Sequence, residues 1–447
     1  MRPQPSFQLT DALPAPFMDH PSKLFVEITT FCNLRCPMCV KQAADSNIID
    51  GDMTEETFSA LEPVFPQLEA LLLNGIGESL MHPHLLDFIH RARHAMPEKS
   101  WIGFQSNGLL LDERWARDLV ASGLDRLCLS VDGIKPDTFS KVREGEALSD
   151  MEKAFDFLAA SRKRQPDTRL KIGVEFVLMQ ENKQQLLATL RWAADRGADF
   201  MLVTQASAYN SSAIAQLAYD NSTEQAIKIF ADWRDKIADM GLDVRNYNPC
   251  WEMDRFYNEP ESETARILEM VDKMRAEARR KDVFLDLPRL LQRSADHSTE
   301  MLALFTEAER LAEKLGIELN LPLAVPHSER KCDFVEDGGA FISWNGDVHP
   351  CYFLWHQFRC FINDWDRLIK PKIFGNINEG PLLNIWNDET FRTFRENVHA
   401  FDYPYCSNCT IAPCDLLQEE DFERDCYAKA EPCGACQWAM GLLQCLH

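Results

Sequence analysis

The sequence predicts an α/β protein: an open, partial (βα)6 TIM-like barrel, then a helical bridge, then a small cysteine-rich domain. Three observations predict this arrangement. Short β-rich runs alternate with amphipathic helical patterns between residues 23 and 205, and ten of the fifteen cysteines lie beyond residue 331. The length of 447 residues also exceeds what one compact core of ordinary size accommodates.

The barrel is predicted from six β-rich runs and the helical patterns between them. The strands are expected at 24–30, 70–73, 102–105, 126–131, 172–179 and 200–204, and the helices at 54–65, 84–95, 113–122, 150–162 and 183–196. Successive βα units imply a parallel sheet with right-handed crossovers. Because the unusual residues follow the strands, we expect the site at the C-terminal rim of the barrel.

The chain is expected to divide into an N-terminal extension (1–22), the barrel (23–205), the helical bridge (206–330) and the cysteine-rich domain (331–447). In the bridge, Ser222 and Gln225 fit a capping box, and further helices are expected at 264–280 and 299–315. The cysteine-rich domain has few long periodic elements, so we expect it to need metal to fold. The barrel core is expected to be independent of the C-terminal tail.

The composition excludes several classes of partner. The net charge of −23, from 70 acidic and 47 basic residues, opposes binding to nucleic acid or to an anionic membrane surface. No run approaches the roughly 18 apolar residues of a membrane helix, and the first residues give no export signal. We therefore expect a cytoplasmic protein, in which fifteen cysteines indicate metal ligation and not disulfides.

The segment FCNLRCPMCV places Cys32, Cys36 and Cys39 on one short loop directly after the first strand. Three thiolates can hold three irons of a [4Fe–4S] cube and leave the fourth iron open to another ligand. The alternative is a zinc site, which needs a fourth ligand nearby. No further Cys or His follows within about forty residues, so the spacing favours the iron–sulfur cluster.

This C-x3-C-x2-C loop after the first strand of a partial barrel resembles the signature of the radical S-adenosylmethionine (SAM) superfamily. The resemblance implies that the open iron chelates the amino and carboxylate groups of SAM. One electron from the cluster would then break the sulfonium bond and give methionine and a 5′-deoxyadenosyl radical. Met38 stands where family members usually carry an aromatic residue, but it is still apolar.

Further matches to the family follow the strands in order. NGIGESL after the second strand resembles the turn that receives the SAM amino group, and the turns after the third and fourth strands resemble those around the ribose and carboxylate. Arg143 could pair with that carboxylate. The resemblance therefore implies SAM contacts from Gly75, Gly77, Glu78, Ser106, Asn107, Ser130, Asp132 and Arg143. Glu175 and Gln205 are weaker candidates for ribose or substrate contacts.

The C-terminal cysteines resemble a SPASM domain, an extension that carries auxiliary [4Fe–4S] clusters in many radical SAM enzymes. Cys332 and Cys351 fit its opening, although the later spacing departs from the usual pattern. Nine cysteines are available where two fully liganded cubes need eight: Cys332, Cys351, Cys406, Cys409, Cys414, Cys426, Cys433, Cys436 and Cys445. The family pattern implies one cluster near Cys332 and Cys351 with help from the tail, and another around Cys406, Cys409 and Cys414. Cys128, Cys250 and Cys360 stand apart and are interpreted as packed or idle thiols.

The tail CGACQWAMGLLQC resembles proteins that mature metalloenzymes, including cofactor-modifying proteins linked to tungsten-dependent aldehyde oxidoreductases. Maturation of a metalloenzyme or metal cofactor is therefore the leading expectation for the substrate. Two alternatives stay open: radical modification of a ribosomal peptide or protein, and a non-catalytic iron–sulfur scaffold or electron carrier. The family also implies a flavodoxin or ferredoxin as the reductant.

Overall fold

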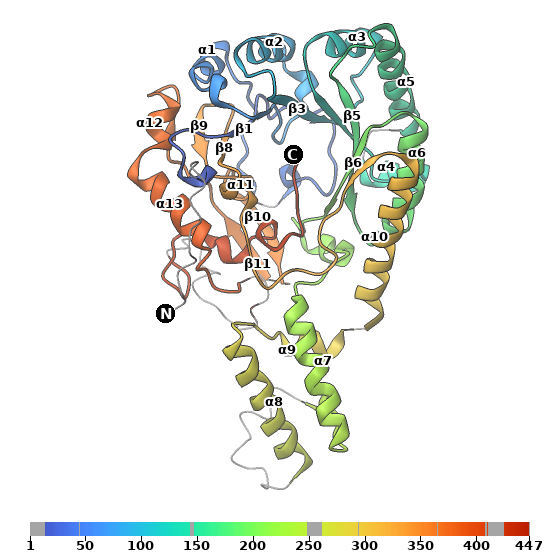
Figure 1. Cartoon of the computed structure of the whole chain (residues 1–447), viewed down its shortest axis with the longest axis vertical. Helices are drawn as coiled ribbons and strands as arrows, with labels where there is room; N and C mark the ends of the chain where they lie inside the picture. Colours follow the sequence, from blue (N-terminus) through green and yellow to red (C-terminus); the bar gives the residue numbers. More distant parts are fainter. Residues whose placement is uncertain are drawn as a thin grey trace.

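The computed structural model describes residues 14–43, 45–143, 147–247, 262–293, 295–363, 365–406, 409 and 424–446. Its centre is a ten-stranded sheet in the order β12-β9-β8-β1-β2-β3-β4-β5-β6-β7 (Figure 1). The six predicted strands are all present: β1 (Lys23–Val26), β2 (Ala70–Leu72), β3 (Trp101–Ser106), β4 (Arg126–Ser130), β5 (Lys171–Leu178) and β6 (Phe200–Gln205). Each pairs in parallel with the next, which confirms the predicted partial barrel.

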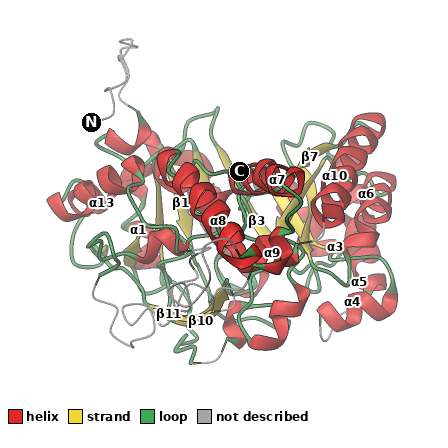
Figure 2. Cartoon of the chain, turned by 90° about the horizontal axis from the view of Figure 1, so that it is seen from below, coloured by secondary structure: helices red, strands yellow, loops and turns green. Residues whose placement is uncertain are grey.

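The helices between these strands lie outside the ring of strands, as Figure 2 shows for α3, α5 and α6. Their bounds are α1 (Glu55–Ser59), α2 (Leu85–Ala95), α3 (Glu113–Ala121), α4 (Pro136–Val142), α5 (Leu148–Arg164) and α6 (Leu186–Asp195). The single helix expected at 54–65 is wrong. The α-helix ends near Ala60 and a 3-10 helix, Glu62–Gln67, follows, because Pro63 has no N–H for the next α-helical hydrogen bond.

The sheet extends beyond the barrel on both edges. On one edge, β7 (Glu318–Asn320) pairs in parallel with β6, and the preceding helix α10 (Ala295–Leu315) packs on α6. On the other edge, β8 (Gly339–Ile342) pairs in parallel with β1, and β9 (Asp347–His349) and β12 (Gly375–Asn376) add antiparallel strands. The two flanking regions of the chain therefore complete the sheet that the barrel begins.

The bridge contains a helical unit with its own apolar core, which extends below the barrel in Figure 1. It consists of α7 (Glu224–Asp239), α8 (Glu263–Arg280) and α9 (Leu287–Gln292). The capping box predicted at Ser222 is wrong by one residue. Thr223 is the N-cap of α7, and its hydroxyl accepts a hydrogen bond from the backbone N–H of Ala226.

The cysteine-rich region adds short elements around the β8–β9 hairpin: α11 (Asp333–Glu336), β10 (Phe358–Ile362), β11 (Trp365–Ile369), α12 (Leu382–Trp386) and α13 (Glu389–Ala400). The strands β10 and β11 form a separate antiparallel pair. None of the helices in the described part of the chain combines the length and apolar character that a membrane crossing requires.

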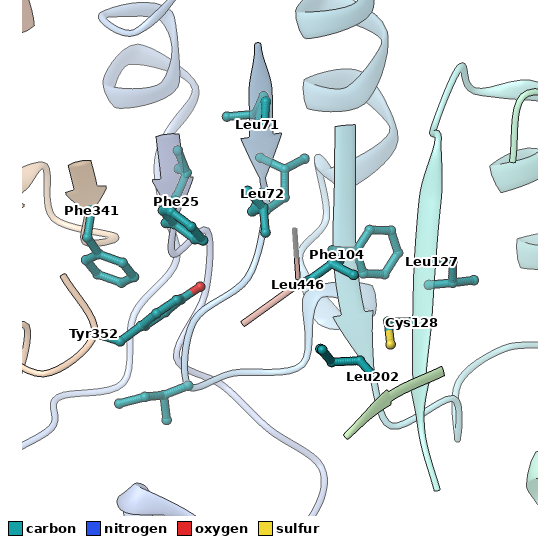
Figure 3. Packing of buried hydrophobic residues seen from close by; sticks show 14 of the residues in the cluster. Phe25, Leu71, Leu72, Phe104, Leu127, Cys128, Leu202, Phe341, Tyr352 and Leu446 are labelled. Carbon is teal, nitrogen blue, oxygen red and sulfur yellow. The ribbon is translucent and has the colours of Figure 1, made fainter. Parts of the chain in front are cut away.

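The C-terminal tail, residues 441–446, returns into the barrel, where Figure 1 marks the end of the chain. Leu446 is 2% exposed and lies among Leu72, Phe104 and Leu202 in Figure 3. The expectation that the barrel core is independent of the tail is therefore wrong. The tail supplies apolar side chains that the open barrel buries.

Candidate functional site

The predicted cluster loop lies at the C-terminal end of β1. Its backbone turns at the second and third cysteines, where the N–H of Cys39 donates to the carbonyl of Cys36 at 3.0 Å. The Lys41 ammonium group fixes the end of the loop by donating to the carbonyl of Thr30 at 2.7 Å. Cys32, Cys36 and Cys39 are all partly exposed residues.

The three thiols lie close enough to interact electrostatically. Burial raises the pKa of each of them, and raises that of Cys36 to about 11, with a further increase from Cys39 and Cys32. Iron binds thiolates and not thiols. A bound cation would therefore be needed to keep the three thiols ionised.

The turn after β2 lies directly on the cluster loop because of its glycines. A Cβ atom at Gly77 would collide with the carbonyl oxygen of Thr29, and one at Gly75 would collide with the side chain of Glu27. The N–H of Glu78 donates to the carbonyl of Phe31 at 2.8 Å. Only glycine permits this approach of two backbones.

The Glu78 carboxylate joins the turns after β2 and β3. It accepts hydrogen bonds from the Ser106 hydroxyl at 2.8 Å, the Asn107 N–H at 2.7 Å and the Leu80 N–H at 3.0 Å. Burial raises the pKa of this carboxyl group, and the three hydrogen bonds lower it. The structure thus brings together Glu78, Ser106 and Asn107, three of the residues predicted to contact SAM. Glu78 connects the turn after β2 to the turn after β3.

Asn107 connects the same turn to the cluster loop. Its side-chain amide donates to Asn33 Oδ1 at 2.8 Å and lies 4.0 Å from the Cys32 sulfur. An N–H group beside a thiolate stabilises its negative charge. This contact places the turn after β3 against the cysteine loop after β1.

Asp132 and Arg143 form a buried ion pair, in which Arg143 Nε lies 2.8 Å from Asp132 Oδ2. The other oxygen of Asp132 accepts the backbone N–H of Val177 at 2.7 Å. The Arg143 charge lowers the pKa values of the three cluster-loop thiols. The guanidinium is therefore a positive charge held next to the cysteine loop.

Glu175 lies on β5 facing the barrel interior. The Ser130 hydroxyl donates to its Oε2 at 3.3 Å, and Gln105 also bonds to this carboxylate. Burial and the neighbouring Asp132 raise the pKa of Glu175 to about 7. The other weak candidate, Gln205, is 1% exposed, and its amide has no hydrogen-bond partner within the described residues.

Several interior polar residues were missed by the sequence analysis. Glu27, at the end of β1, contacts His356 with 3.0 Å between Oε2 and Nε2, and accepts the N–H of Ile76 at 3.1 Å. Asn74 donates to the Tyr352 hydroxyl at 2.8 Å. A charged residue inside the apolar run LFVEI was a signal for Glu27, whereas nothing in the sequence indicated that residues 352–356 reach the barrel.

A second group of sulfurs lines a hollow in the cysteine-rich region. Four cysteines line it, and we therefore call it the four-thiol hollow: Cys332, Cys351, Cys433 and Cys436. The hollow contains about 320 Å³ of space, part of which is open to solvent. Cys332 precedes α11 and Cys351 follows β9. Cys433 lies in the 3-10 helix Pro432–Ala435, and Cys436 directly follows that helix. The hollow thus combines the start and the tail of the region, as the family pattern implies.

The remaining walls of the four-thiol hollow are apolar, and include Val335, Phe353 and Phe394. Burial raises the pKa of Cys351 to about 12 and that of Cys436 to about 11. Four soft ligands in an apolar cage fit an iron–sulfur cube, whose iron would supply the charge that keeps the thiolates ionised.

Cys406, Cys409 and Cys426 form a further group of electrostatic neighbours. Burial raises the pKa of Cys406 to about 12, and the other two thiols raise it further. A Cβ at Gly434 would lie 3.3 Å from the Cys406 sulfur, so this group lies against the tail loop of the hollow. Cys414, predicted for this cluster, lies outside the described residues, as does Cys250.

Three cysteines lie apart from these groups. Cys128 and Cys360 are 0% and 3% exposed and belong to the apolar core. Cys445, which was predicted as a cluster ligand, does not line the four-thiol hollow. Trp438 forms a hydrogen bond with the Cys445 thiol, and Glu175, Cys351 and Cys436 also interact with this thiol electrostatically.

Across the residues that the structure describes, no group of three or more His, Cys, Asp or Glu side chains is gathered as a single metal ion requires. A cube attaches its thiolates to separate irons, so they surround a cage and not a point.

Two family models match this chain. The radical SAM superfamily model matches residues 26–193, and the SPASM iron–sulfur cluster-binding domain matches residues 332–410. The barrel with its cysteine loop lies in the first match, and the four-thiol hollow begins in the second.

Similar proteins include the tungsten-containing aldehyde ferredoxin oxidoreductase cofactor-modifying protein of Pyrococcus furiosus, 25% identical over 94% of this chain and 96% of that protein. The GTP 3′,8-cyclase of Chlorobaculum tepidum is 29% identical over 30% of this chain and 40% of its own length. Among solved structures, Streptococcus suis SuiB bound to S-adenosylmethionine is 12% identical with a TM-score of 0.47, covering 84% of this chain and 68% of SuiB.

The structure agrees with both matches. The cysteine loop at the end of β1 and the glycine turn packed on it fit the first match, and the separate cysteine-rich region fits the second. The radical SAM assignment also overturns the alternative of a non-catalytic scaffold. The chain belongs to the radical SAM superfamily and is a radical SAM enzyme with a SPASM domain, which uses a [4Fe–4S] cluster and SAM.

Proposed function

We propose that this radical SAM enzyme takes part in maturing a metalloenzyme or its metal cofactor. The observation that carries the proposal is the similarity to the Pyrococcus furiosus cofactor-modifying protein, which spans nearly the whole of both chains. At 94% of this chain, the similarity is not confined to the barrel. The substrate class is therefore inferred from the full-length match.

The residues of the first loop fit the proposed cluster. Cys32, Cys36 and Cys39 supply three thiolates, and Asn107 and Arg143 bring an N–H donor and a positive charge beside them. When bound there with SAM, the cluster supplies the electron that cleaves the sulfonium bond. The protein's part is to hold the thiolates ionised and to keep one coordination position open.

The SAM contacts remain a proposal for Gly75, Gly77, Glu78, Ser106, Asn107, Ser130, Asp132 and Arg143. The glycine turn exposes backbone carbonyls that can accept from an ammonium group. The buried Arg143 provides the positive charge that a carboxylate requires. Because Glu78 already accepts three hydrogen bonds within the protein, we propose that it shapes the turn and adds negative charge.

We propose two auxiliary clusters in the SPASM domain. The first would use the four cysteines of the four-thiol hollow, whose apolar walls and mutual proximity support it. The second would use Cys406, Cys409 and Cys426, with Cys414 as its expected fourth ligand. A flavodoxin or ferredoxin is the proposed electron donor, and neither nucleic acid nor a membrane surface is a proposed partner, given the charge of −23.

The maturation proposal is tested in a host that produces a tungsten-dependent aldehyde oxidoreductase. The enzyme is purified from cells that carry this chain, lack it, or carry the Cys36→Ala variant. We expect tungsten content and aldehyde oxidation to require the unaltered chain. Equal tungsten content and activity in all three would overturn the proposal, and 5′-deoxyadenosine release that depends on a small peptide would favour the peptide-modifying alternative.

A further inference from the structure

One short segment of the SPASM domain, residues 351–356, contacts both the four-thiol hollow and the barrel. Cys351 and Phe353 line the hollow, whereas Tyr352 and His356 contact polar residues at the ends of the barrel strands. Both barrel-facing side chains are largely buried, with 8% of Tyr352 and 14% of the His356 side chain exposed. The segment therefore brings two polar groups of the SPASM domain into the barrel.

Tyr352 contacts the residue at which the glycine turn after β2 (residues 74–78) begins. Its hydroxyl accepts a hydrogen bond from Asn74 Nδ2 at 2.8 Å and donates a longer one, 3.4 Å, to the Asn74 carbonyl. The Tyr352 ring packs edge-on against Phe25 and Phe341, with ring centroids 5.3 and 5.1 Å apart (Figure 3). The phenol is thus held by the core and bonds to both the side chain and the backbone of Asn74.

His356 acts on the middle of the same turn through Glu27. Its Nε2 lies 3.0 and 3.1 Å from the two carboxylate oxygens of Glu27, which is 0% exposed. One of these oxygens accepts the backbone N–H of Ile76 at 3.1 Å, and the Glu27 side chain fills the space that a Cβ at Gly75 would need. Because a buried carboxyl group is unfavourable without hydrogen-bond donors, His356 stabilises Glu27 in its place beside the turn.

The glycine turn depends on such contacts for its shape. Glycine offers no side chain that could anchor a turn, so neighbouring residues must restrict its backbone. At the far end of the turn, Glu78 bonds to the cluster loop and to the turn after β3. At its start and middle, Tyr352 and the pair of Glu27 and His356 supply the contacts from the SPASM domain.

We propose that Tyr352 and His356 are positioning residues through which the SPASM domain prepares the SAM site. They hold the backbone of the glycine turn in the shape that receives the SAM amino group, His356 acting through Glu27. Without them, part of the binding free energy of SAM would be spent on ordering the turn, and the affinity would fall. The inference rests on the proposed SAM contacts of the turn, and it adds that this part of the site is complete only with the SPASM domain in place.

The test measures the dissociation constant of SAM by equilibrium dialysis with anaerobically reconstituted, unreduced full-length protein. Tyr352→Phe removes only the hydroxyl, and His356→Leu removes the donor to Glu27. We expect each change to weaken SAM binding by about three- to tenfold at unchanged iron content, the effect of losing one hydrogen bond. His356→Gln keeps an N–H donor at this position and should restore most of the affinity.

Thr57→Val is the matched control. The Thr57 hydroxyl, on α1, donates to Asn378 Oδ1 at 3.0 Å, so this bond also joins the barrel to the SPASM domain but does not involve the glycine turn. We expect its loss to leave SAM affinity unaltered. An equal loss of affinity in Thr57→Val would overturn the inference, because it would show a general loosening between the domains.

Two further results would also overturn the inference. One is unaltered SAM affinity in both Tyr352→Phe and His356→Leu. The other is iron loss in parallel with the loss of affinity, which would place the effect in the four-thiol hollow.

Gly77→Ala tests the underlying SAM assignment of the turn by itself. A Cβ atom at this position would collide with the carbonyl oxygen of Thr29, so we expect weaker SAM binding. Normal affinity in this variant would refute the assignment of the turn and the inference with it, whereas weakened binding here alone would refute only the role of Tyr352 and His356. None of these measurements uses the tungsten enzyme, so failure of the maturation proposal remains distinguishable.

Discussion

The cluster loop and the four-thiol hollow both gather cysteine thiols, but they take them from different parts of the chain. The loop takes three thiols from a single turn after β1, between Cys32 and Cys39. The hollow takes its thiols from the start of α11, the end of β9 and the tail. A site on one turn can be read from spacing, whereas a site assembled from distant segments depends on the fold around it.

The largest expected effect comes from the cluster loop. Replacing Cys32, Cys36 and Cys39 together with Ala should lower iron from about twelve to about eight per chain and abolish SAM cleavage, because the loop is local and other clusters do not depend on it. Iron analysis and chromatography for 5′-deoxyadenosine measure the two effects. Continued 5′-deoxyadenosine release would show that the cluster has been assigned to the wrong cysteines.

The matching change in the hollow is Cys433→Ala with Cys436→Ala. We expect loss of about four irons together with protease sensitivity across the SPASM domain, because distant segments are held together there by metal. SAM cleavage should persist at a reduced rate. Limited proteolysis and iron analysis test this, and an intact protease pattern after iron loss would show that the hollow folds without metal. The double variant is preferable to truncation before Glu431, which would also remove Leu446 from the barrel.

The barrel interior should show a pH dependence that the hollow lacks. The pKa of Glu175 is raised to about 7 in the folded protein, so the fold favours its protonated form. The resulting stability is present below about pH 4.5 and is lost as pH rises through about 7, a change of up to about 3 kcal/mol. In thermal unfolding from pH 5.5 to 8.5, Glu175→Gln should therefore gain stability relative to the unaltered protein as pH rises. Parallel curves would contradict this.

A smaller effect is expected from Glu78→Ala. The change leaves three buried donors without their acceptor, so we expect a stability loss of about 2 kcal/mol and weaker SAM binding, at unchanged iron content. Chemical unfolding and SAM titration measure these separately. Unaltered SAM affinity with reduced stability would restrict Glu78 to bonding the two turns together.

The barrel was predictable because its information is local. Each of the six strands is a β-rich run next to a helical pattern, and Gly75, Gly77 and Glu78 follow β2 in sequence as they do in space. The edge strands β7, β8 and β9 are only three or four residues long. Strands this short show no recognisable alternation of apolar and polar residues, and β7 and β8 pair with strands that are far away in the sequence. The same holds for Tyr352 and His356, whose contacts with Asn74 and Glu27 exist only after the SPASM domain has docked. Pro63 indicates a helix end in the sequence, and the single helix expected at 54–65 did not take it into account.

The return of the tail into the barrel also has a consequence for synthesis in the cell. The ribosome releases the cluster loop early and residues 441–446 much later, yet Leu446 packs among side chains of β2, β3 and β6. During translation the barrel therefore stays incompletely packed, with the side that the tail will occupy still open. The barrel interior reaches its final packing only once the tail has emerged.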